Sequence, residues 1–358
     1  MRMTAGWMIA GLLLAACGSE AAAPPAKPAP PVSQPPPPSV PSGFEAVGAA
    51  LVEASFTDAR LVVGDAEGIL WQAEKGRFDA DAAVPVASAS KLLAAIVIFR
   101  LVERGEMSLD DRPQDYLDDW PSDPADPRSD ITLEMLLSFT SGLWGERGEV
   151  GCLARRFVLL DECVREIRDA GLGHAPGDAF AYGPNHLQVA AAMAEAASGK
   201  RWYELVESEL VVPLGLGSTD FGGRMVTNPR IAGGAQSSAR DYGRVLQALL
   251  AGDLIADLES FIAPRTAALA KLATPDAAIA SGDWAYALGN WRECDFPDYV
   301  RDCADARIFS SAGAFGWMPW IDLEHGYWGL VARQGSMGSS EASTALEQRV
   351  QPLIEAAL

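Results

Sequence analysis

The sequence predicts an α/β (α+β) fold, in which helices flank an antiparallel sheet built from both ends of the chain and a helical subdomain is inserted. Three observations predict it. Strand-like patterns rich in aromatic and β-branched residues occur at 55–74 and again between 286 and 333. Helical periodicity dominates 130–250. The 358 residues are 49% hydrophobic, which is ample for a large core.

The first 16 residues are predicted to be a signal peptide. Arg2 precedes an apolar run, Trp7 to Ala16, that is too short to span a bilayer. The run ends Leu-Ala-Ala-Cys17-Gly18, which resembles a bacterial lipoprotein signal that is cleaved before a lipidated Cys17. An ordinary signal peptide with a chance cysteine is the alternative. Because no aspartate follows Cys17, we expect a lipid anchor in the outer membrane, with the domain facing the periplasm or the exterior.

Residues 17–43 are predicted to be a linker, and residues 44–358 a single folded domain. Prolines crowd the linker at 24–25, 30–31 and 35–38, and such a segment favours an extended polyproline II conformation. We interpret it as a semi-rigid spacer between the membrane and the domain. A Pro-rich ligand for a partner protein is the alternative.

The predicted elements of the domain follow in order. Two strands lie within 55–74 around a Gly-rich turn, and an apolar helix runs from Ser88 to about Gly105. Further helices are predicted at 133–137, 160–170, 185–198, 202–210 and 239–250. Strands are then predicted at 286–291, 307–311, 315–321 and 326–333, before a last amphipathic helix at about 341–356.

The charge excludes two classes of partner. The formal net charge is −20 and the pI is near 4.5. Nucleic acid requires a basic surface, and so does a polybasic attachment to anionic lipid. We interpret the charge as a solvated acidic surface that keeps the protein in solution.

Four cysteines remain after Cys17 is set aside, and an even number in an exported chain indicates disulfides. Proximity favours pairing Cys152 with Cys163 and Cys294 with Cys303, although three pairings are possible. Metal ligation is the weaker alternative, because the spacings are long and no Cys-x-x-Cys occurs.

The most informative motif is Ser88-Ala89-Ser90-Lys91. It holds one of only five lysines and is the only Ser/Thr-x-x-Lys in the chain. Residues i and i+3 share one face of a helix, so we expect Lys91 to reach the Ser88 hydroxyl. A helix start offers unpaired N–H groups for an oxyanion, and a buried lysine can serve as a base.

Five segments together resemble the serine β-lactamase and penicillin-binding-protein superfamily, most closely its class C β-lactamase-like and esterase branch. The first is the Ser88 motif. The segment 131–143 (ITLEMLLSFTSGL) is similar to the family's TLRHLLTHTSGL, and 180–185 (FAYGPN) to Tyr-x-Asn. The segment 232–242 (AGGAQSSARDY) resembles AGGLxSTARDLA, and 310–316 (SSAGAFG) occupies the place of Lys/His-x-Gly.

The resemblance implies roles for particular residues. Ser88 would be the nucleophile that forms an acyl-enzyme, and Lys91 would help to take its proton. Tyr182 would be the partner base and then the acid toward the leaving group. The N–H groups of Ser88 and Ala314 would form the oxyanion hole, with Ala314 on the strand after Gly313. Gly313 would let the substrate lie close along that strand.

Two positions depart from the family pattern. In Tyr182-Gly183-Pro184-Asn185 a proline stands at the asparagine position, so Asn185 either reaches the site or caps the following helix. Ser311 stands where the family has Lys or His, a cation that helps to bind the carboxylate of β-lactams and peptides. Its absence favours a neutral ester, amide or lactone, unless Arg333 or Arg307 substitutes.

Other sites have less support in the sequence. A Ser-His-Asp triad would need His174, His186 or His325, but no Gly-x-Ser-x-Gly elbow occurs. We expect His186 to pack at a helix start, with a position lining the cleft as the alternative, and His325 to lie in a hairpin turn. No phosphate loop or metal cluster is apparent, so we expect no cofactor and no metal.

Three functions therefore compete. A lipid-anchored serine hydrolase acting on a small-molecule or peptide-like acyl substrate comes first: an esterase or related hydrolase, then a β-lactamase, then a DD-peptidase. A binding protein on the same fold with a decayed site is second, and a structural lipoprotein whose stalk is functional is third. The aromatic residues Phe139, Trp144, Trp317 and Trp320 either line an acyl pocket or fill the core.

Overall fold

The computed structural model describes residues 43–143, 150–275, 284–296, 299–300 and 306–358, which all belong to one compact unit, Val40–Leu358. Cys17, the signal segment, the linker up to residue 42, Trp144 and Cys303 lie outside the described residues. Within the described part of the chain, no helix is long and apolar enough to cross a membrane.

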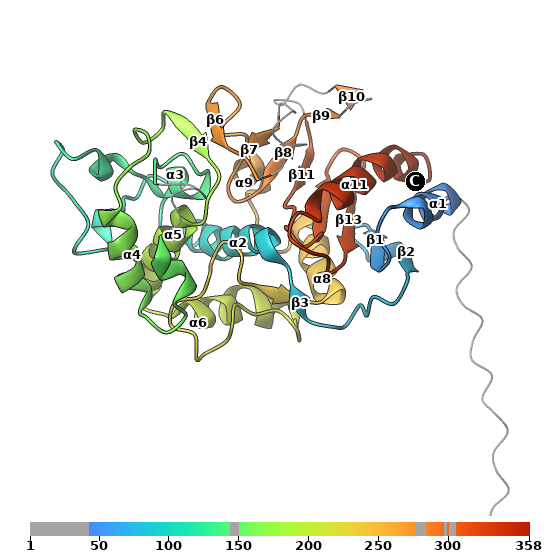
Figure 1. Cartoon of the computed structure of the whole chain (residues 1–358), viewed down its shortest axis with the longest axis horizontal. Helices are drawn as coiled ribbons and strands as arrows, with labels where there is room; N and C mark the ends of the chain where they lie inside the picture. The colour runs from blue at the N-terminus through green and yellow to red at the C-terminus, as the bar shows by residue number, and fades with distance from the viewer. Residues whose placement is uncertain (1–42, 144–149, 276–283, 297–298, 301–305) are drawn as a thin grey trace, which may run out of the picture. The chain divides into compact units, whose positions relative to one another are not determined.

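The centre of the unit is a seven-stranded sheet with the order β2-β1-β13-β12-β11-β8-β7, and all of its neighbours are antiparallel. β1 near the start of the domain pairs with β13 near its end, so that Arg60 lies opposite Ala332. The predicted sheet from both ends of the chain is therefore confirmed (Figure 1). Its strands are β1 (Ala59–Gly64), β2 (Ile69–Lys75), β7 (Ala285–Tyr286), β8 (Trp291–Glu293), β11 (Ile308–Ser310), β12 (Met318–Asp322) and β13 (Tyr327–Ala332).

Short strands form three further pairs: β3 with β5, β4 with β6, and β9 with β10. Their bounds are β3 (Val84–Pro85), β4 (Ala179–Ala181), β5 (Gln236–Ser237), β6 (Ala270–Ala273), β9 (Asp295–Phe296) and β10 (Tyr299–Val300). The helices are α1 (Glu45–Glu53), α2 (Ser90–Glu103), α3 (Leu133–Leu137), α4 (Leu160–Asp169), α5 (Asn185–Ser198), α6 (Trp202–Val206), α7 (Val212–Leu214), α8 (Ala239–Leu250), α9 (Leu258–Ile262) and α11 (Ser340–Glu355).

Helices cover both faces of the sheet. Met318 of β12 accepts a hydrogen bond from Thr344 of α11, whereas Trp328 of β13 packs against Gly243 of α8. Trp328 lies directly opposite Ile321 in the pairing of β12 and β13, so these two side chains point to the same face. Ile321 and Met318 are three residues apart on β12, so their side chains point to opposite faces. α11, with α1 beside it, therefore lies on one face and α8 on the other.

The inserted helical part is attached to the sheet side of the molecule through α2, which contacts α5 and α6 (Figure 1). Residues 92–99 of α2 are all buried, which explains the continuous apolar run in the sequence. The predicted helix at 202–210 is interrupted: α6 continues into a π-helical turn at Glu207–Val211 before α7.

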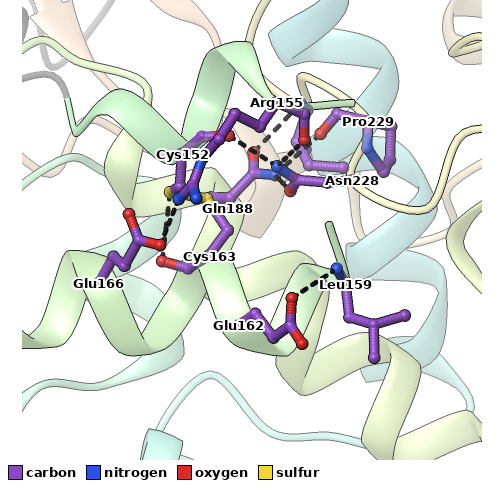
Figure 2. The surroundings of a disulfide bond; sticks show 10 residues. Cys152, Arg155, Leu159, Glu162, Cys163, Glu166, Gln188, Asn228 and Pro229 are labelled. Carbon is purple, nitrogen blue, oxygen red and sulfur yellow. Dashed lines mark hydrogen bonds and ion pairs between the residues drawn. A yellow bond between two sulfur atoms is a disulfide. The ribbon is translucent and has the colours of Figure 1, made fainter. Parts of the chain in front are cut away.

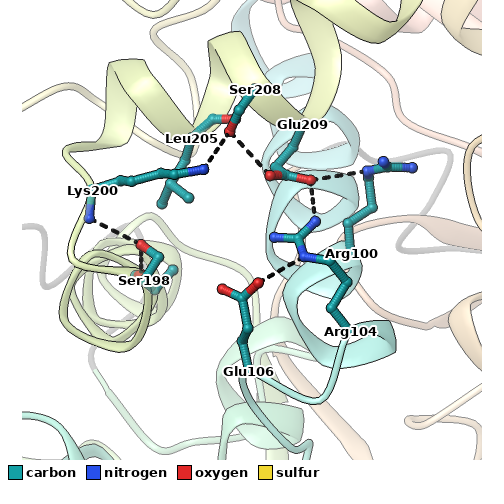
Figure 3. A network of polar contacts seen from close by, with 9 residues as sticks. Arg100, Arg104, Glu106, Ser198, Lys200, Leu205, Ser208 and Glu209 are labelled. Atoms are coloured by element: carbon teal, nitrogen blue, oxygen red, sulfur yellow. Dashed lines mark hydrogen bonds and ion pairs between the residues drawn. The ribbon is translucent and has the colours of Figure 1, made fainter.

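A polar network ties the C-terminal end of α2 to this π-helical turn (Figure 3). The buried Glu209 carboxylate accepts hydrogen bonds from Arg104, from Arg100 Nε at 3.3 Å and from Ser208 at 3.0 Å. Burial alone would raise the pKa of Glu209, but the hydrogen bonds and the guanidinium charges outweigh it and lower the pKa. The carboxylate is thus held ionised, and it fastens two helical segments together.

A disulfide joins Cys152 to Cys163 of α4, with the Cα atoms 5.2 Å apart (Figure 2). It stabilises the short loop that leads into α4. Asn228 Nδ2 donates to Cys152 O at 2.9 Å, and Gln188 of α5 donates to Asn228 Oδ1 at 2.7 Å, so the closed loop is also bonded to α5. Cys294 is disulfide-bonded as well.

Two of the predicted strands differ from the observed ones. The stretch 286–291 is not one strand but the hairpin of β7 and β8. Gly289 in its turn has φ +71°, and a Cβ there would lie 2.4 Å from Ala95 Cβ, so the tight approach to α2 needs a glycine. The strand predicted at 315–321 begins only at Met318, because residues 313–316 form a turn.

Candidate active site

Ser88 lies in a strained turn just before α2. The turn is a 3₁₀ helix, Ala87–Ala89, and Ala87 has φ +47°, which is uncommon for a residue other than glycine. Ser90 holds this backbone, since its hydroxyl donates to Ala87 O at 2.5 Å and accepts from Ala235 N at 3.0 Å. The half-buried Ser88 is thereby presented on a fixed backbone.

Lys91 is brought to the Ser88 hydroxyl, as its spacing predicts. Its Nζ lies 2.9 Å from Ser88 Oγ and 2.9 Å from Ala232 O. The whole residue is only 4% exposed. The carbonyl of Ala232, in the AGGAQSSARDY segment, therefore holds Lys91 Nζ beside the serine.

Tyr182 follows β4 and lies on the other side of Lys91. The lysine Nζ is 4.4 Å from the centroid of the Tyr182 ring. The ring is 2% exposed and stacks on Trp291 at 5.7 Å, while Phe139 meets it edge-on at 5.4 Å. Ser88, Lys91 and Tyr182, from two separate sequence segments, are thus brought together.

The predicted aromatic candidates belong to the core. Phe139, Trp317 and Trp320 are each 0% exposed. Phe139 has φ +60° and stacks on Tyr286 at 4.8 Å, so it helps to build the wall behind Tyr182. Buried aromatic packing, not an open acyl pocket, accounts for these three residues.

Asn185 does not cap the helix that follows Tyr182. The N-cap position of α5 is Pro184, which makes no side-chain capping bond, and Asn185 is the first helical residue, with no exposed surface. The capping interpretation is therefore wrong. A role for Asn185 in substrate binding stays a prediction.

The third motif lies beside the Ser88 turn. Ser311 Oγ donates to Ser88 O at 3.4 Å. A Cβ on Gly313 would lie 2.2 Å from Val86 O, so only glycine lets the two segments approach this closely. Ala314 lies in the turn after Gly313, where a strand was predicted, and its N–H donates no hydrogen bond to any described residue. That donor is available for an oxyanion.

Neither arginine considered as a substitute cation is hydrogen-bonded to Ser88 or Ser311 within the described part of the chain, but Arg333 lies against Gly316 of the third motif, where a Cβ would be 2.9 Å from its Cδ. Arg307 is bound to Glu259, with its Nη1 2.9 Å from Oε2. Arg333 lies on the ring of Phe56, with its Cζ 4.1 Å from the centroid, and burial lowers the pKa of its guanidinium. Ser311 itself supplies a hydroxyl and no charge.

Within the described part of the chain, none of the three histidines is bonded to both a serine and an aspartate as a catalytic triad requires, and His174 Nδ1 lies 2.8 Å from Ala175 O. His186 is fully buried and bonds Ser141, which is also 0% exposed, so this Ser–His pair cannot receive a substrate. His325 lies in the predicted hairpin turn between β12 and β13, where its Nδ1 is 2.7 Å from Asp322 Oδ2.

Among the residues that the structure describes, one group of side chains has the composition of a metal site: Asp322, His325 and Glu355, whose ligand atoms lie within 4.8 Å of one another. The Asp322 carboxylate already accepts from His325 Nδ1 and from the backbone N–H groups of Glu324 and His325. We therefore assign this group to the stability of the hairpin turn.

A well-formed pocket lies away from Ser88. It has a volume of about 470 Å³ and is lined by Trp120, Leu160 of α4 and Ala192 of α5, among others. Ser88, Lys91 and Tyr182 are not part of its lining. The chemistry is therefore assigned by the geometry around Ser88 and not by cavity size.

Three contacts that build the site were not predicted from the sequence: those of the Ser90 hydroxyl, the Ala232 carbonyl and the His186 ring. Ser90 and Ala232 stand inside recognised segments, so their positions could have been noted. The contact between Lys91 Nζ and the Ala232 carbonyl could not have been predicted, because a backbone carbonyl is placed by the fold and not by the identity of a side chain.

Comparisons with known proteins identify the family and support the fold. The family model described as Beta-lactamase matches residues 48–347. Esterase EstB from Burkholderia gladioli is 30% identical over 192 residues, which cover 48% of this chain and 49% of the esterase. Penicillin-binding protein 4 from Amycolatopsis lactamdurans is 29% identical over 157 residues, covering 42% of this chain and 39% of that protein. The chain thus spans less than half the length of these relatives.

A solved structure supports the fold. Unliganded simvastatin synthase from Aspergillus terreus superposes with a TM-score of 0.66 and covers 87% of this chain and 97% of that one. At 20% sequence identity the likeness concerns the fold alone. The family model, which spans most of the chain and all of the segments around Ser88, establishes that the protein belongs to the Beta-lactamase family.

Proposed function

We propose that the protein is a serine hydrolase that acts through a Ser88 acyl-enzyme on an ester, amide or lactone. The observation that carries the proposal is the 2.9 Å contact between Lys91 Nζ and Ser88 Oγ inside a buried site. Ser88 Oγ would attack the substrate carbonyl as its proton passes to Lys91 or Tyr182. Collapse of the tetrahedral oxyanion would break the bond to the leaving group, which takes the proton, and water would then hydrolyse the acyl-serine.

The other residues have distinct proposed roles. Tyr182 would exchange the proton with the leaving group and the water, because its ring lies against Lys91. The Ala314 and Ser88 N–H groups would stabilise the oxyanion, and Gly313 and Ser311 would line the approach to it. Asn185, which has no exposed surface here, would contact the acyl group only if the site opens when the substrate binds.

An uncharged acyl substrate is favoured over a carboxylate-bearing one. Ser311 replaces the cation of the third motif, and Arg307 is engaged with Glu259. Arg333 lies against Gly316 with Nε and Nη1 buried and unpartnered among the described residues, so it remains the candidate cation for a carboxylate-bearing substrate. Similarity to an esterase supports this ranking. A β-lactamase or a DD-peptidase is the second candidate, supported by similarity to a penicillin-binding protein. A non-catalytic binding protein on the same fold is the third.

The proposal includes a location. The segment ending at Cys17 supports removal of residues 1–16, lipidation of Cys17 and attachment to the outer membrane, with residues 17–43 as the spacer. The folded domain from residue 44 would then face the periplasm or the exterior.

A substrate panel tests the proposed activity. We expect the domain to hydrolyse p-nitrophenyl butyrate faster than a chromogenic cephalosporin or an acyl-D-Ala-D-Ala peptide, and Ser88→Ala to abolish all turnover. Preference for the cephalosporin would make the protein a β-lactamase. Turnover by Ser88→Ala at the wild-type rate would contradict the assignment of Ser88 as the nucleophile.

A further inference from the structure

We infer that His186 is a positioning residue that fixes Tyr182 for proton transfer at Ser88. The inference rests on the proposed function and extends it to a side chain that does not touch the substrate. His186 lies in the first turn of α5 with no exposed surface. It connects three parts of the site: the start of α5, the backbone immediately before Tyr182, and Ser141.

Both ring nitrogens of His186 are hydrogen-bonded. Nε2 lies 3.0 Å from Ala181 O, and Nδ1 lies 2.8 Å from Ser141 Oγ. A carbonyl oxygen can only accept, so Nε2 must carry the proton. Burial lowers the pKa of His186 to about 3, so the ring is neutral and Nδ1 must accept from the Ser141 hydroxyl. The tautomer is therefore determined by its two partners.

The bond to Ala181 holds the peptide plane that leads into Tyr182. The carbonyl of this peptide accepts from His186, and its N–H, which belongs to Tyr182, donates to Ala273 O at 3.0 Å. On the other side, Ala181 N donates to Phe139 O at 3.1 Å. With both ends of the peptide bonded, the plane cannot rotate, and the direction of the Tyr182 side chain is set.

The faces of the rings supply a second restraint. The imidazole of His186 stacks on Phe139 with the centroids 4.9 Å apart and the planes at 17°. Phe139 in turn meets the Tyr182 ring edge-on at 5.4 Å. Phe139 stands where the related segment TLRHLLTHTSGL has its second histidine, so this chain places an imidazole beside that position from α5 instead.

Removing the imidazole would leave the Ala181 carbonyl without its donor and the Phe139 ring without its stacking partner. The centroid of the Tyr182 ring now lies 4.4 Å from Lys91 Nζ, and the ring would then shift from this position. Small displacements of a reacting group are costly in rate, on the order of 10²-fold for about 1 Å. The loss should appear in kcat and not in KM, because His186 makes no contact with bound substrate.

The test compares His186→Leu with His186→Gln. Leucine fills the space without polar atoms, whereas the glutamine amide has both a donor for Ala181 O and an acceptor for the Ser141 hydroxyl. His325→Leu, in the hairpin turn between β12 and β13, is the control. For each variant, kcat and KM for p-nitrophenyl butyrate are measured from pH 5 to 10 and corrected for the fraction labelled by a fluorophosphonate.

We expect His186→Leu to lose about 30-fold to 100-fold in kcat per labelled site, with KM changed less than about 2-fold. In the profile of kcat against pH, the limb that reports proton transfer should also shift for this variant. His186→Gln should recover most of the rate, and His325→Leu should match the wild type in both readouts.

Separate outcomes overturn the separate claims. If His186→Leu is folded and keeps the wild-type kcat and pH profile, or if glutamine and leucine lose the same amount, the inference is wrong while the proposed function stands. A wild-type protein that neither labels nor hydrolyses the ester removes the proposed function and this inference with it.

Discussion

Lys91→Met is expected to lower kcat/KM for p-nitrophenyl butyrate by about 10³-fold, within the range that a lost general base produces. Lys91 Nζ lies 2.9 Å from Ser88 Oγ, and methionine keeps most of the side-chain volume while it removes the nitrogen. The measurement is steady-state ester hydrolysis at neutral pH, together with the thermal midpoint of the variant.

Lys200→Met is the matched control. Lys200 is exposed, and its Nζ donates to Ser208 Oγ at 3.2 Å, remote in the sequence from the Ser88 motif. We expect it to keep the wild-type rate. Methionine retains the apolar stem of the buried lysine, so the variant should remain folded. A folded Lys91→Met with full activity would rule out the mechanism.

The second large effect concerns a pair of buried carboxyl groups under α11. Glu293 of β8 and Glu347 of α11 are each 0% exposed, and Gln351 donates to Glu293 Oε2 at 3.3 Å. Burial raises the pKa of Glu293 to about 7, and burial together with Glu293 raises the pKa of Glu347 well above its usual range. Asp322 of β12 adds to the rise at Glu293.

The sign of the pH effect follows from these pKa values. An unfolded Glu293 titrates near its ordinary pKa, so between that value and about 7 the folded protein binds more protons than the unfolded one. The contribution of Glu293 to the free energy of unfolding is therefore fully present below its ordinary pKa and is lost as the pH rises through about 7. The loss from Glu293 is on the order of 3 kcal/mol, at about 1.4 kcal/mol per pKa unit.

Glu293→Gln should remove most of this loss. We expect its free energy of unfolding to match the wild type near pH 4.5 and to exceed it at pH 8, measured by urea denaturation across that range. Glu341→Gln, at the exposed start of the same helix, serves as the control and should leave the pH dependence unchanged. If the free energy of unfolding of Glu293→Gln depends on pH as in the wild type, the burial of Glu293 beside Glu347 does not cause that dependence.

The sequence predicted the fold because the signals of the sheet are local. The segments at 55–74 and between 286 and 333 predicted strands, and a sheet built from the two ends then followed from the helical middle. It failed at 286–291, where Gly289 turns the chain back beneath α2. A glycine inside a strand pattern permits such a turn, but its contact with Ala95 depends on the tertiary structure.

The Ser88–Lys91 contact was predictable for a reason that does not depend on the exact helix start. α2 begins at Ser90, and Ser88 lies in a 3₁₀ turn, but a 3₁₀ turn also places residues i and i+3 on one side. The position of Ala314 was not predictable, since a single Gly313–Trp317 bridge decides between strand and turn. His186 resembled a packed histidine in the sequence, and only the structure shows which carbonyl it holds.

The most direct test of the central claim is the intact mass of the domain, residues 44–358, after exposure to a fluorophosphonate, beside its Ser88→Ala variant. An activated Ser88 predicts one adduct on the wild type and none on the variant. No adduct on a folded wild type, or an adduct that persists on Ser88→Ala, would contradict the claim that Ser88 is the nucleophile.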